Sequence, residues 1–171
     1  MQKVIELTTP FSEEAICALN VGDVVSITGY IYTGRDAVLP RVIKLAKEGR
    51  LNEYGIDMQG AVIFHTAVSP AGVGPTSSNK VEIESSFEPL SRYGVKMHLG
   101  KGAISKPTIE ALKKHNAVFA VIPPVTALLE SQTEEREVVA FPELGMEAMN
   151  RLKVVKYPAI IGAAKGKSIS D

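Results

Sequence analysis

Three short strand-like segments, separated by stretches of helical periodicity, constrain the fold of this 171-residue sequence more than any other feature. They lie at residues 61–64, 96–99 and 117–122, and the first and third are apolar, as in buried strands. Residues 81–93 and 107–115 lie between them and have the pattern of a helix. Because strands that alternate with helices usually pair in parallel, we predict an α/β fold with a mixed, partly parallel sheet flanked by helices.

The segments on either side extend this pattern within one domain, which we expect to span residues 1–171. We predict strands at residues 3–7, 24–31, 138–141 and 157–161, and helices at residues 12–19, 38–47, 126–132 and 146–152. Gly29 is expected to mark a bulge in its strand. Residues 134–137 suggest a solvated turn, and residues 162–171 are small and polar, as in a loose tail.

Composition argues against several classes of protein. The formal net charge is +0, aromatic residues make up 6% of the chain and Trp is absent. These values disfavour a nucleic-acid binder built on bulk positive charge or on stacking platforms. No apolar run reaches the roughly 20 residues of a membrane span, and the first residues lack the apolar core of a signal peptide. We therefore expect a cytoplasmic protein that binds neither nucleic acid nor membrane.

The chain has few residues of the kinds that bind metals. Its single cysteine, Cys17, excludes an internal disulfide and a cysteine-built cluster, and its apolar, helical surroundings predict an inert core residue. His65, His98 and His115 lack metal-ligand spacing with one another or with nearby carboxylates, so we predict no metal site in this chain. His65 follows a predicted strand, where it either packs near the core or lines a pocket.

A segment rich in glycine and hydroxyl residues, Ala-Gly-Val-Gly-Pro-Thr-Ser-Ser-Asn-Lys, occupies residues 71–80 between a predicted strand and a predicted helix. We interpret it as a loop in which Gly72 and Gly74 let the backbone approach a ligand. Its Thr-Ser-Ser run suits the N-cap of the following helix, whose free N–H groups attract anions. The alternative is a turn that only caps the helix.

Three cationic residues follow predicted strands or this segment. Arg35 comes just after a strand, Lys101 lies between two glycines after another, and Lys80 ends the glycine-hydroxyl segment. Ligands of α/β folds usually bind beyond the carboxyl ends of strands, so the three residues predict a pocket for a small anion. Asp36 would either orient the Arg35 guanidinium or cap the next helix. The alternative is that all three cations are solvated surface charges.

The order of several motifs resembles a known family. The motifs are Leu-Asn-Val-Gly-Asp-Val-Val at residues 19–25, Gly-Arg-Asp at 34–36, Gly-Pro-Thr-Ser-Ser at 74–78, Gly-Lys-Gly at 100–102 and Phe-Pro-Glu-Leu-Gly at 141–145. In this order they are similar to the β subunit of iron–sulfur (class I) fumarases and L(+)-tartrate dehydratases. The same unit forms the C-terminal domain where these enzymes are one chain. The similarity runs from about residue 9 to about residue 166.

The resemblance implies a swivelling β/β/α domain that closes on an α subunit, in a hetero-oligomer such as α2β2. In that family the α subunit holds a [4Fe–4S] cluster on three cysteines, and the cluster's open iron acts as a Lewis acid on the departing hydroxyl of a small dicarboxylate. The resemblance assigns substrate binding to Arg35, Lys80, Lys101, Gly74 and Ser77. It makes Thr76 a candidate catalytic base.

The sequence departs from the family pattern at three places. Family members usually have arginine at the position of Lys80, often have Ala-His where this chain has Ala37-Val38, and often have aspartate in place of Ala164. The core set of motifs is retained. The expected function is therefore that of the β subunit of a hydro-lyase acting on malate and fumarate. The alternatives are a tartrate dehydratase β subunit and a non-catalytic module that binds small anions.

Overall fold

Parallel strands that run side by side form the centre of the sheet. The computed structural model describes residues 3–69, 72–76, 80–122 and 126–168. The parallel strands, in their order across the sheet, are β1 (Val4–Thr8), β2 (Val24–Thr33), β3 (Val62–Phe64), β6 (Met97–Gly100) and β7 (Val118–Val121). The partly parallel sheet expected from the alternation of strands and helices is therefore confirmed.

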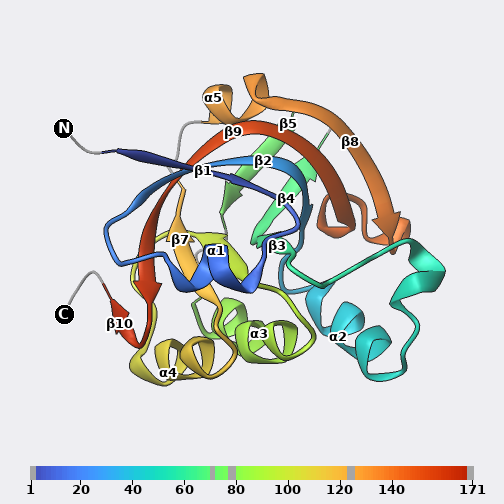
Figure 1. Cartoon of the computed structure of the whole chain (residues 1–171). Coiled ribbons are helices and arrows are strands. Elements are labelled where there is room, and N and C mark those ends of the chain that lie inside the picture. Colours follow the sequence, from blue (N-terminus) through green and yellow to red (C-terminus); the bar gives the residue numbers. More distant parts are fainter. Residues whose placement is uncertain (1–2, 70–71, 77–79, 123–125, 169–171) are drawn as a thin grey trace.

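The long strand β9 (Met149–Ala164) closes this sheet on itself. It pairs antiparallel with β2 along most of its length and with β7 near its end, so the pairings β2–β3–β6–β7–β9–β2 form a ring. Two further strands, β8 (Thr133–Ala140) and β10 (Lys167–Ser168), pair antiparallel with β9. Figure 1 shows β9 as a long red arc that crosses above β2, with β8 beside it.

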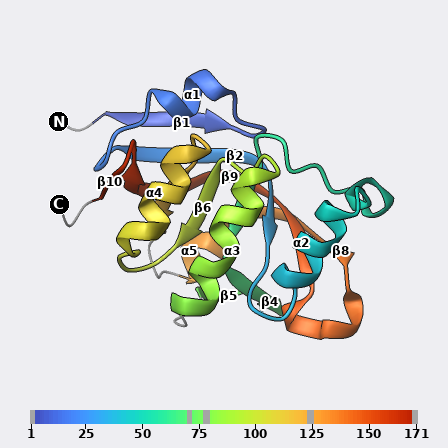
Figure 2. The same ribbon diagram turned by 90° about the horizontal axis from the view of Figure 1, so that it is seen from below.

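Helices cover the outer side of the parallel strands. The helices α2 (Leu39–Lys47), α3 (Lys80–Arg92) and α4 (Lys106–Lys114) lie next to one another on one face of the sheet, as Figure 2 shows. The remaining helical elements are α1 (Glu13–Cys17), the 3-10 helix η1 (Leu51–Tyr54), α5 (Thr126–Ser131) and the 3-10 helix η2 (Pro142–Glu147). No helix among the described residues is long and apolar enough to span a membrane.

The alternation of side chains along each strand divides the core into an inner and an outer part. In β3, Val62 and Phe64 belong to the cluster enclosed by the ring, whereas Ile63 belongs to a second cluster beneath α2 and α3. Tyr157 of β9 meets Phe64 edge-on inside the ring, with ring centroids 6.3 Å apart. Burying each such side chain contributes about 1.5–3 kcal/mol, so both faces of the strands stabilise the fold.

The predicted helix at residues 146–152 is wrong, because Met149 begins β9 and residues 142–147 form η2. The spacing of Met146, Met149 and Leu152 is typical of a helix, but Met149, Leu152 and Val154 are buried as a strand that pairs with β2. Lys156 has a left-handed backbone (φ 54°), and the register of β9 with β2 shifts here, between the pairs Ile27–Tyr157 and Gly29–Val154. A bulge therefore lies beside Gly29, but its extra residue belongs to β9 and not to the strand of Gly29 as predicted.

Two surface predictions also need correction. Residues 134–137 are not a turn but part of β8, whose charged side chains are exposed and paired with neighbours such as Arg151. The chain is not a loose tail from residue 162 onward, because Gly162–Ala164 end β9 and Lys167–Ser168 form β10. Residues 169–171 lie outside the described part of the chain. In both places pairing with β9 supplies the order that local composition did not indicate.

Cys17 was predicted to be an inert core residue, and it is exposed. The helix α1 has only five residues and buries only Ile16 of them. A helix this short turns one residue toward the core and its neighbour toward solvent, so the apolar composition around Cys17 was misleading.

A pair of buried histidines joins the parallel strands to α3. His65, directly after β3, and His98 of β6 are both fully buried, and their rings share a hydrogen bond of 3.1 Å between Nε2 and Nδ1. His98 Nε2 also lies 2.9 Å from Oγ of Ser91 in α3, and Phe87 of α3 stacks on the His98 ring. Burial lowers the pKa of His65 to about 3, and burial with the neighbouring His65 lowers the pKa of His98. Both rings are therefore neutral near pH 7.

The buried pair predicts that the protein loses stability in mild acid. In the unfolded chain each histidine binds a proton below about pH 6.5, whereas folded His65 does not until the pH approaches 3, and burial also lowers the pKa of folded His98 well below its usual value. Between these limits the free energy of unfolding should therefore decrease as the pH is lowered, by up to about 1.4 kcal/mol per pH unit for each histidine. Urea unfolding measured at intervals from pH 7 to pH 4 tests this.

The double variant His65→Gln/His98→Gln should have a shallower pH dependence than the wild type. The matched control is His115→Gln, which removes a half-buried histidine outside this pair and should leave the slope nearly unchanged. If the double variant does not fold, NMR of the wild-type imidazoles decides the point. A His65 or His98 ring that titrates between pH 7 and pH 5 in the folded protein contradicts the prediction.

Candidate functional site

The carboxyl ends of β2, β3 and β6 bring three of the predicted site segments to one edge of the sheet. Arg35 follows β2 after Gly34, a hairpin begins just after β3, and Lys101 is the first residue after β6. The three strands are parallel neighbours, so these ends lie side by side. Backbone hydrogen bonds continue past the strands, from Gly34 N–H to Phe64 O at 3.0 Å and from His65 N–H to Leu99 O at 3.1 Å.

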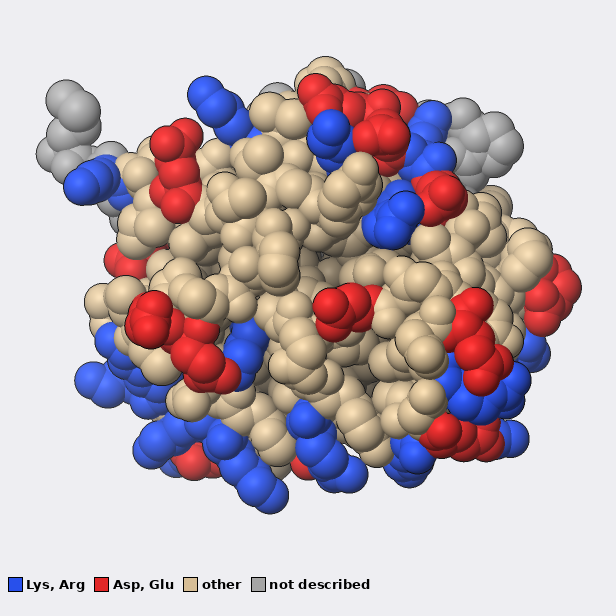
Figure 3. Space-filling view, turned by 45° about the vertical axis from the view of Figure 1, so that its right-hand side comes forward, with Lys and Arg blue, Asp and Glu red and all other residues tan. Residues whose placement is uncertain are grey.

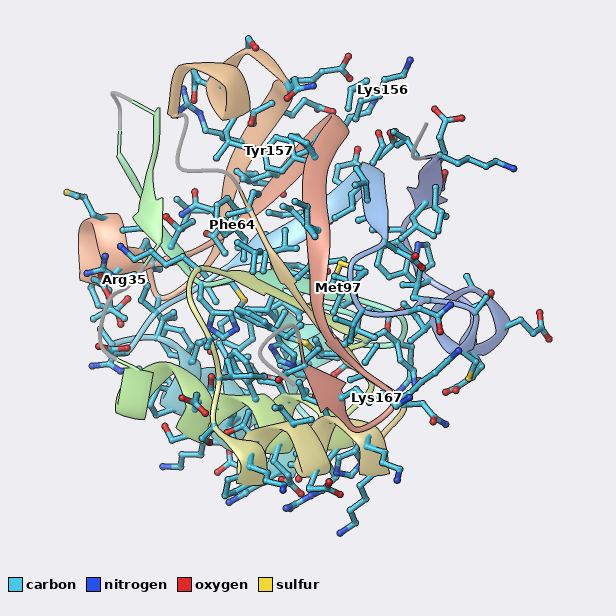
Figure 4. The ribbon with its side chains drawn as sticks, turned by 90° about the vertical axis from the view of Figure 1, so that its left-hand side faces the viewer. Arg35, Phe64, Met97, Lys156, Tyr157 and Lys167 are labelled. Carbon is cyan, nitrogen blue, oxygen red and sulfur yellow. The ribbon has the colours of Figure 1, made fainter. Side chains whose placement is uncertain are left out.

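Arg35 lies at the periphery of the molecule with one edge of its guanidinium covered. Figure 4 shows it beside the coil of η2 and below the green hairpin strands. Its Nε is 3.0 Å from Oε2 of Glu147, and the side chains are 32% and 26% exposed. The buried Nε–H nevertheless has no hydrogen-bond partner, because its direction does not match that oxygen. The guanidinium is thus held by charge while its hydrogen-bonding capacity is not used up.

Glu147 was not anticipated from the sequence. It comes from the last turn of η2, far from Arg35 along the chain, and no local pattern links the two residues. The two roles suggested for Asp36 are not observed. The N-cap of α2 is Val38, which makes no side-chain cap, and the ion pair of Arg35 is with Glu147.

Lys101 is exposed and lies in a bend after β6. The next residue, Gly102, has φ 77°, a left-handed conformation that a side chain would strain. On the other side, a Cβ on Gly100 would lie 3.1 Å from the Phe119 ring, closer than most packed atoms. The two glycines of the Gly-Lys-Gly motif therefore serve the local backbone, and the lysine side chain extends outward.

The segment predicted as a loop at residues 71–80 is largely a strand. Thr66–Ser69 form β4 and Gly72–Thr76 form β5, an antiparallel pair outside the main sheet in which Thr66 is opposite Thr76. Pairing with β4 keeps the glycine-containing stretch extended. The short sequence Thr-Ala-Val-Ser of β4 does not by itself indicate this pairing. Gly74 and Thr76 are thus backbone members of a hairpin rather than of an open loop.

The structure describes the backbone but not the side chain of one predicted substrate-binding residue, and it does not describe another at all. Lys80 is the first residue of α3, as expected for a residue at the helix start, although its side chain lies outside the described atoms, as does that of Thr76. Ser77 lies outside the described residues. The observed geometry therefore joins Arg35, Lys101 and the backbone of β5 at one edge.

Two elements from the second half of the chain support the hairpin. The helix α5 packs against β5, and η2 packs against β4. Figure 1 shows the green hairpin below α5, outside the main sheet. The hairpin therefore depends on residues after β7 for its position, although it follows β3 in sequence.

The surface charge is mixed rather than concentrated. In the face shown in Figure 3, Lys and Arg are interspersed with Asp and Glu around a mostly uncharged centre that includes acidic atoms. Beside the Arg35 segment lies a hollow of about 280 Å³, lined by Asp36, Leu39, Pro40, Ile43, Lys47, Ser85 and Ser86. A site of local cations in neutral surroundings suits a small anion better than a polyanion.

The chain's own residues do not fit an iron–sulfur cluster. Three thiolates are needed, and the sequence contains one cysteine. Among the residues that the structure describes, no group of three or more His, Cys, Asp or Glu side chains has the geometry to hold a metal ion. Any cluster associated with this protein must be held elsewhere.

Comparison with known proteins agrees with the motifs. The sequence matches the Fumarase C-terminus family over residues 1–170. It is 31% identical to a putative fumarate hydratase class I of Geobacillus stearothermophilus, a match that covers 94% of this chain and 32% of that protein. It is 35% identical to the L(+)-tartrate dehydratase subunit beta of Escherichia coli (strain K12), over 85% of this chain and 74% of that subunit.

A third relative has a similar relation to the chain. The anaerobic class I fumarate hydratase of Escherichia coli (strain K12) is 29% identical over 92% of this chain and 30% of its own length. The chain thus spans about a third of the two fumarate hydratases and about three quarters of the tartrate dehydratase subunit. Because the family match extends over nearly the whole sequence, this chain belongs to the Fumarase C-terminus family.

Proposed function

We propose that this chain is the β subunit of a two-subunit hydro-lyase that reversibly removes water from a 2-hydroxy dicarboxylate. The observation that carries the proposal is the meeting of Arg35, Lys101 and the β5 backbone at the carboxyl ends of adjacent parallel strands. Family membership and the names of the relatives, fumarate hydratase and tartrate dehydratase, support the reaction type.

Arg35 and Lys101 have the chemistry to bind the two carboxylates of such a substrate. A guanidinium binds a carboxylate through two parallel hydrogen bonds, whereas a lysine acts as a compact point charge. Among the described residues, neither the Nη groups of Arg35 nor Lys101 makes a hydrogen bond or ion pair. We assign further binding to Lys80 at the start of α3, to the Gly74 backbone and to Ser77.

Thr76 is our candidate for the base that takes the proton next to a carboxylate. An ordinary threonine hydroxyl is a poor base, so the role requires a closed, cation-lined site that stabilises its deprotonated form. The hairpin position of Thr76 supports the assignment, because β5 ends at this residue and α3, with Lys80 first, follows after a short segment.

Malate is the first substrate to test and L(+)-tartrate the second. Both are 2-hydroxy dicarboxylates and would make the same contacts with two cations. The match to the tartrate dehydratase subunit, with its separate-subunit form, is the specific observation in favour of tartrate.

We further propose that the partner is an α subunit that holds a [4Fe–4S] cluster, in a complex such as α2β2. The single cysteine supports this division, because the chain cannot ligate a cluster by itself. A domain that swivels onto this partner would complete the pocket that Arg35, Lys101 and the hairpin leave open on one side.

The first consequence is that the purified chain alone has no hydro-lyase activity and binds no iron. Adding the α subunit with a reconstituted cluster should restore turnover, measured anaerobically from the absorbance of fumarate or from the oxaloacetate formed from tartrate. The α subunit alone is the control. Robust hydration of fumarate by this chain alone would overturn the two-subunit proposal.

Replacing either proposed carboxylate ligand should weaken catalysis without unfolding the protein. A charge-assisted hydrogen bond contributes about 1.5–3 kcal/mol, so Arg35→Met or Lys101→Met should lower kcat/KM of the complex about 10- to 150-fold. Both side chains are at least partly exposed, so the melting temperature should change little.

Lys114→Met is the matched control for Lys101→Met. Lys114 is an exposed lysine in the last turn of α4, which runs back from the carboxyl end of β6 to the opposite edge of the sheet. Its replacement should leave kcat/KM unchanged. Equal kinetics for Lys101→Met and Lys114→Met would show that the proposed pocket is misplaced.

Variants of Thr76 distinguish a catalytic role of its hydroxyl from a structural one. If its hydroxyl transfers the proton, Thr76→Ala should lower kcat about 10²- to 10⁴-fold with little change in KM. Thr76→Ser keeps the hydroxyl and should retain much more activity. Both variants need melting temperatures measured beside the rates, since a destabilised hairpin would also lower the rate. An alanine variant that melts lower yet turns over normally would remove Thr76 from the catalytic assignment.

A further inference from the structure

The contact between Arg35 and Glu147 joins the candidate site to η2. Nε of Arg35 and Oε2 of Glu147 are 3.0 Å apart, and both side chains are mostly covered. The contact involves the Nε edge of the guanidinium. Among the described residues, no side chain or backbone group bonds the terminal Nη groups of Arg35, so the opposite edge is available to an external carboxylate.

The segment that carries Glu147 is itself anchored. Phe141, just before η2, stacks on Tyr54 with ring centroids 5.8 Å apart, and the Arg41 guanidinium lies 5.5 Å above the Phe141 ring. Within η2 the backbone turns sharply at Gly145 (φ 59°, ψ −121°), a conformation that suits glycine. This turn follows the anchored part of η2 and leads directly to Glu147.

The same segment also contacts the hairpin. Because η2 packs against β4, Glu147 connects Arg35 to the element that contains Gly74 and Thr76. Figure 4 shows Arg35 beside the η2 coil and below the hairpin strands. A flexible arginine held at one edge in this way has fewer orientations to lose when it binds a substrate.

We propose that Glu147 is a positioning residue for Arg35: it holds the Nε edge of the guanidinium so that the Nη edge faces a substrate carboxylate. The proposal rests on the proposed function for its kinetic consequence. Glu147 touches neither substrate nor reacting atoms in this account, and it acts only through Arg35.

The charge of Glu147 has a second effect, because it also repels an incoming dicarboxylate. Positioning of Arg35 strengthens substrate binding, whereas this repulsion weakens it. If repulsion is the larger effect, removing the carboxylate lowers KM. If positioning is the larger effect, removing it raises KM. The sign of the change in KM separates them. Glu147→Gln, which keeps the shape of the side chain and loses its charge, tests whether the charge holds Arg35.

The kinetic test uses the reconstituted two-subunit complex and the dicarboxylate it turns over fastest. We expect Glu147→Ala to raise KM about tenfold and to leave kcat within about threefold of the wild type. Glu147→Gln should also raise KM, because Glu147 and Arg35 form an ion pair without an aligned hydrogen bond. A KM for Glu147→Ala that is unchanged or lower would overturn the proposal, and so would a Glu147→Gln variant with the KM of the wild type.

Glu143→Ala is the matched control. Glu143 also lies in η2, and it pairs with Nη1 of Arg41 at 3.4 Å. It therefore links η2 to α2, the helix that follows Arg35. Arg41 is not part of the proposed pocket. Glu143→Ala should therefore leave KM unchanged, and comparison of its melting temperature with that of Glu147→Ala corrects for loss of a surface ion pair.

A second readout needs neither partner nor substrate. In the isolated chain, the Arg35 Nε–Hε NMR signal, assigned by its loss in Arg35→Lys, should exchange slowly with water because Nε is buried. In both Glu147→Ala and Glu147→Gln it should exchange faster than in the wild type, at least tenfold faster in Glu147→Ala. An unchanged signal in Glu147→Ala overturns the positioning role. A wild-type complex that turns over no dicarboxylate would instead overturn the proposed function, while the NMR result still decides how Arg35 is held.

Discussion

The pairing of β9 with both β2 and β7 is the constraint on which the rest of the structure depends. Without it the parallel strands would end in two open edges, which are exposed to aggregation and set no curvature. The closed ring encloses the inner core around Phe64 and Tyr157 and fixes the directions in which β2, β3 and β6 end. The bulge near Lys156 lets one long strand bend enough to serve both partners.

The ring in turn positions α3 through a polar contact inside an apolar layer. His65 directly follows β3, and His98 lies in the neighbouring strand β6. Ser91 of α3 makes the next hydrogen bond of this network, with His98. Buried polar groups are costly unless they are paired, so this network specifies one position for the helix more sharply than apolar packing would. The same helix begins with Lys80, and the buried pair therefore connects core packing to the candidate site.

The candidate site combines charges of both signs, which suits a small dianion. Local cations in a chain of zero net charge would favour the proposed dicarboxylate over polyanions. The ion pair of Arg35 with Glu147 fits this proposal, because it orders a cation while reducing its long-range field. A second subunit is the proposed means of closing the site.

The sequence by itself determined the alternation of strands and helices, the place of the bulge beside Gly29 and the position of Arg35 and Lys101 after strands, because these depend on local periodicity and turn chemistry. It did not determine β9, which local spacing predicted as a helix followed by a shorter strand, nor the exposure of Cys17. Nor did it reveal Glu147 or the hairpin that carries Thr76. Only the tertiary structure decided these, because pairing across the ring and between η2 and the β2 end joins residues that have no relation along the chain.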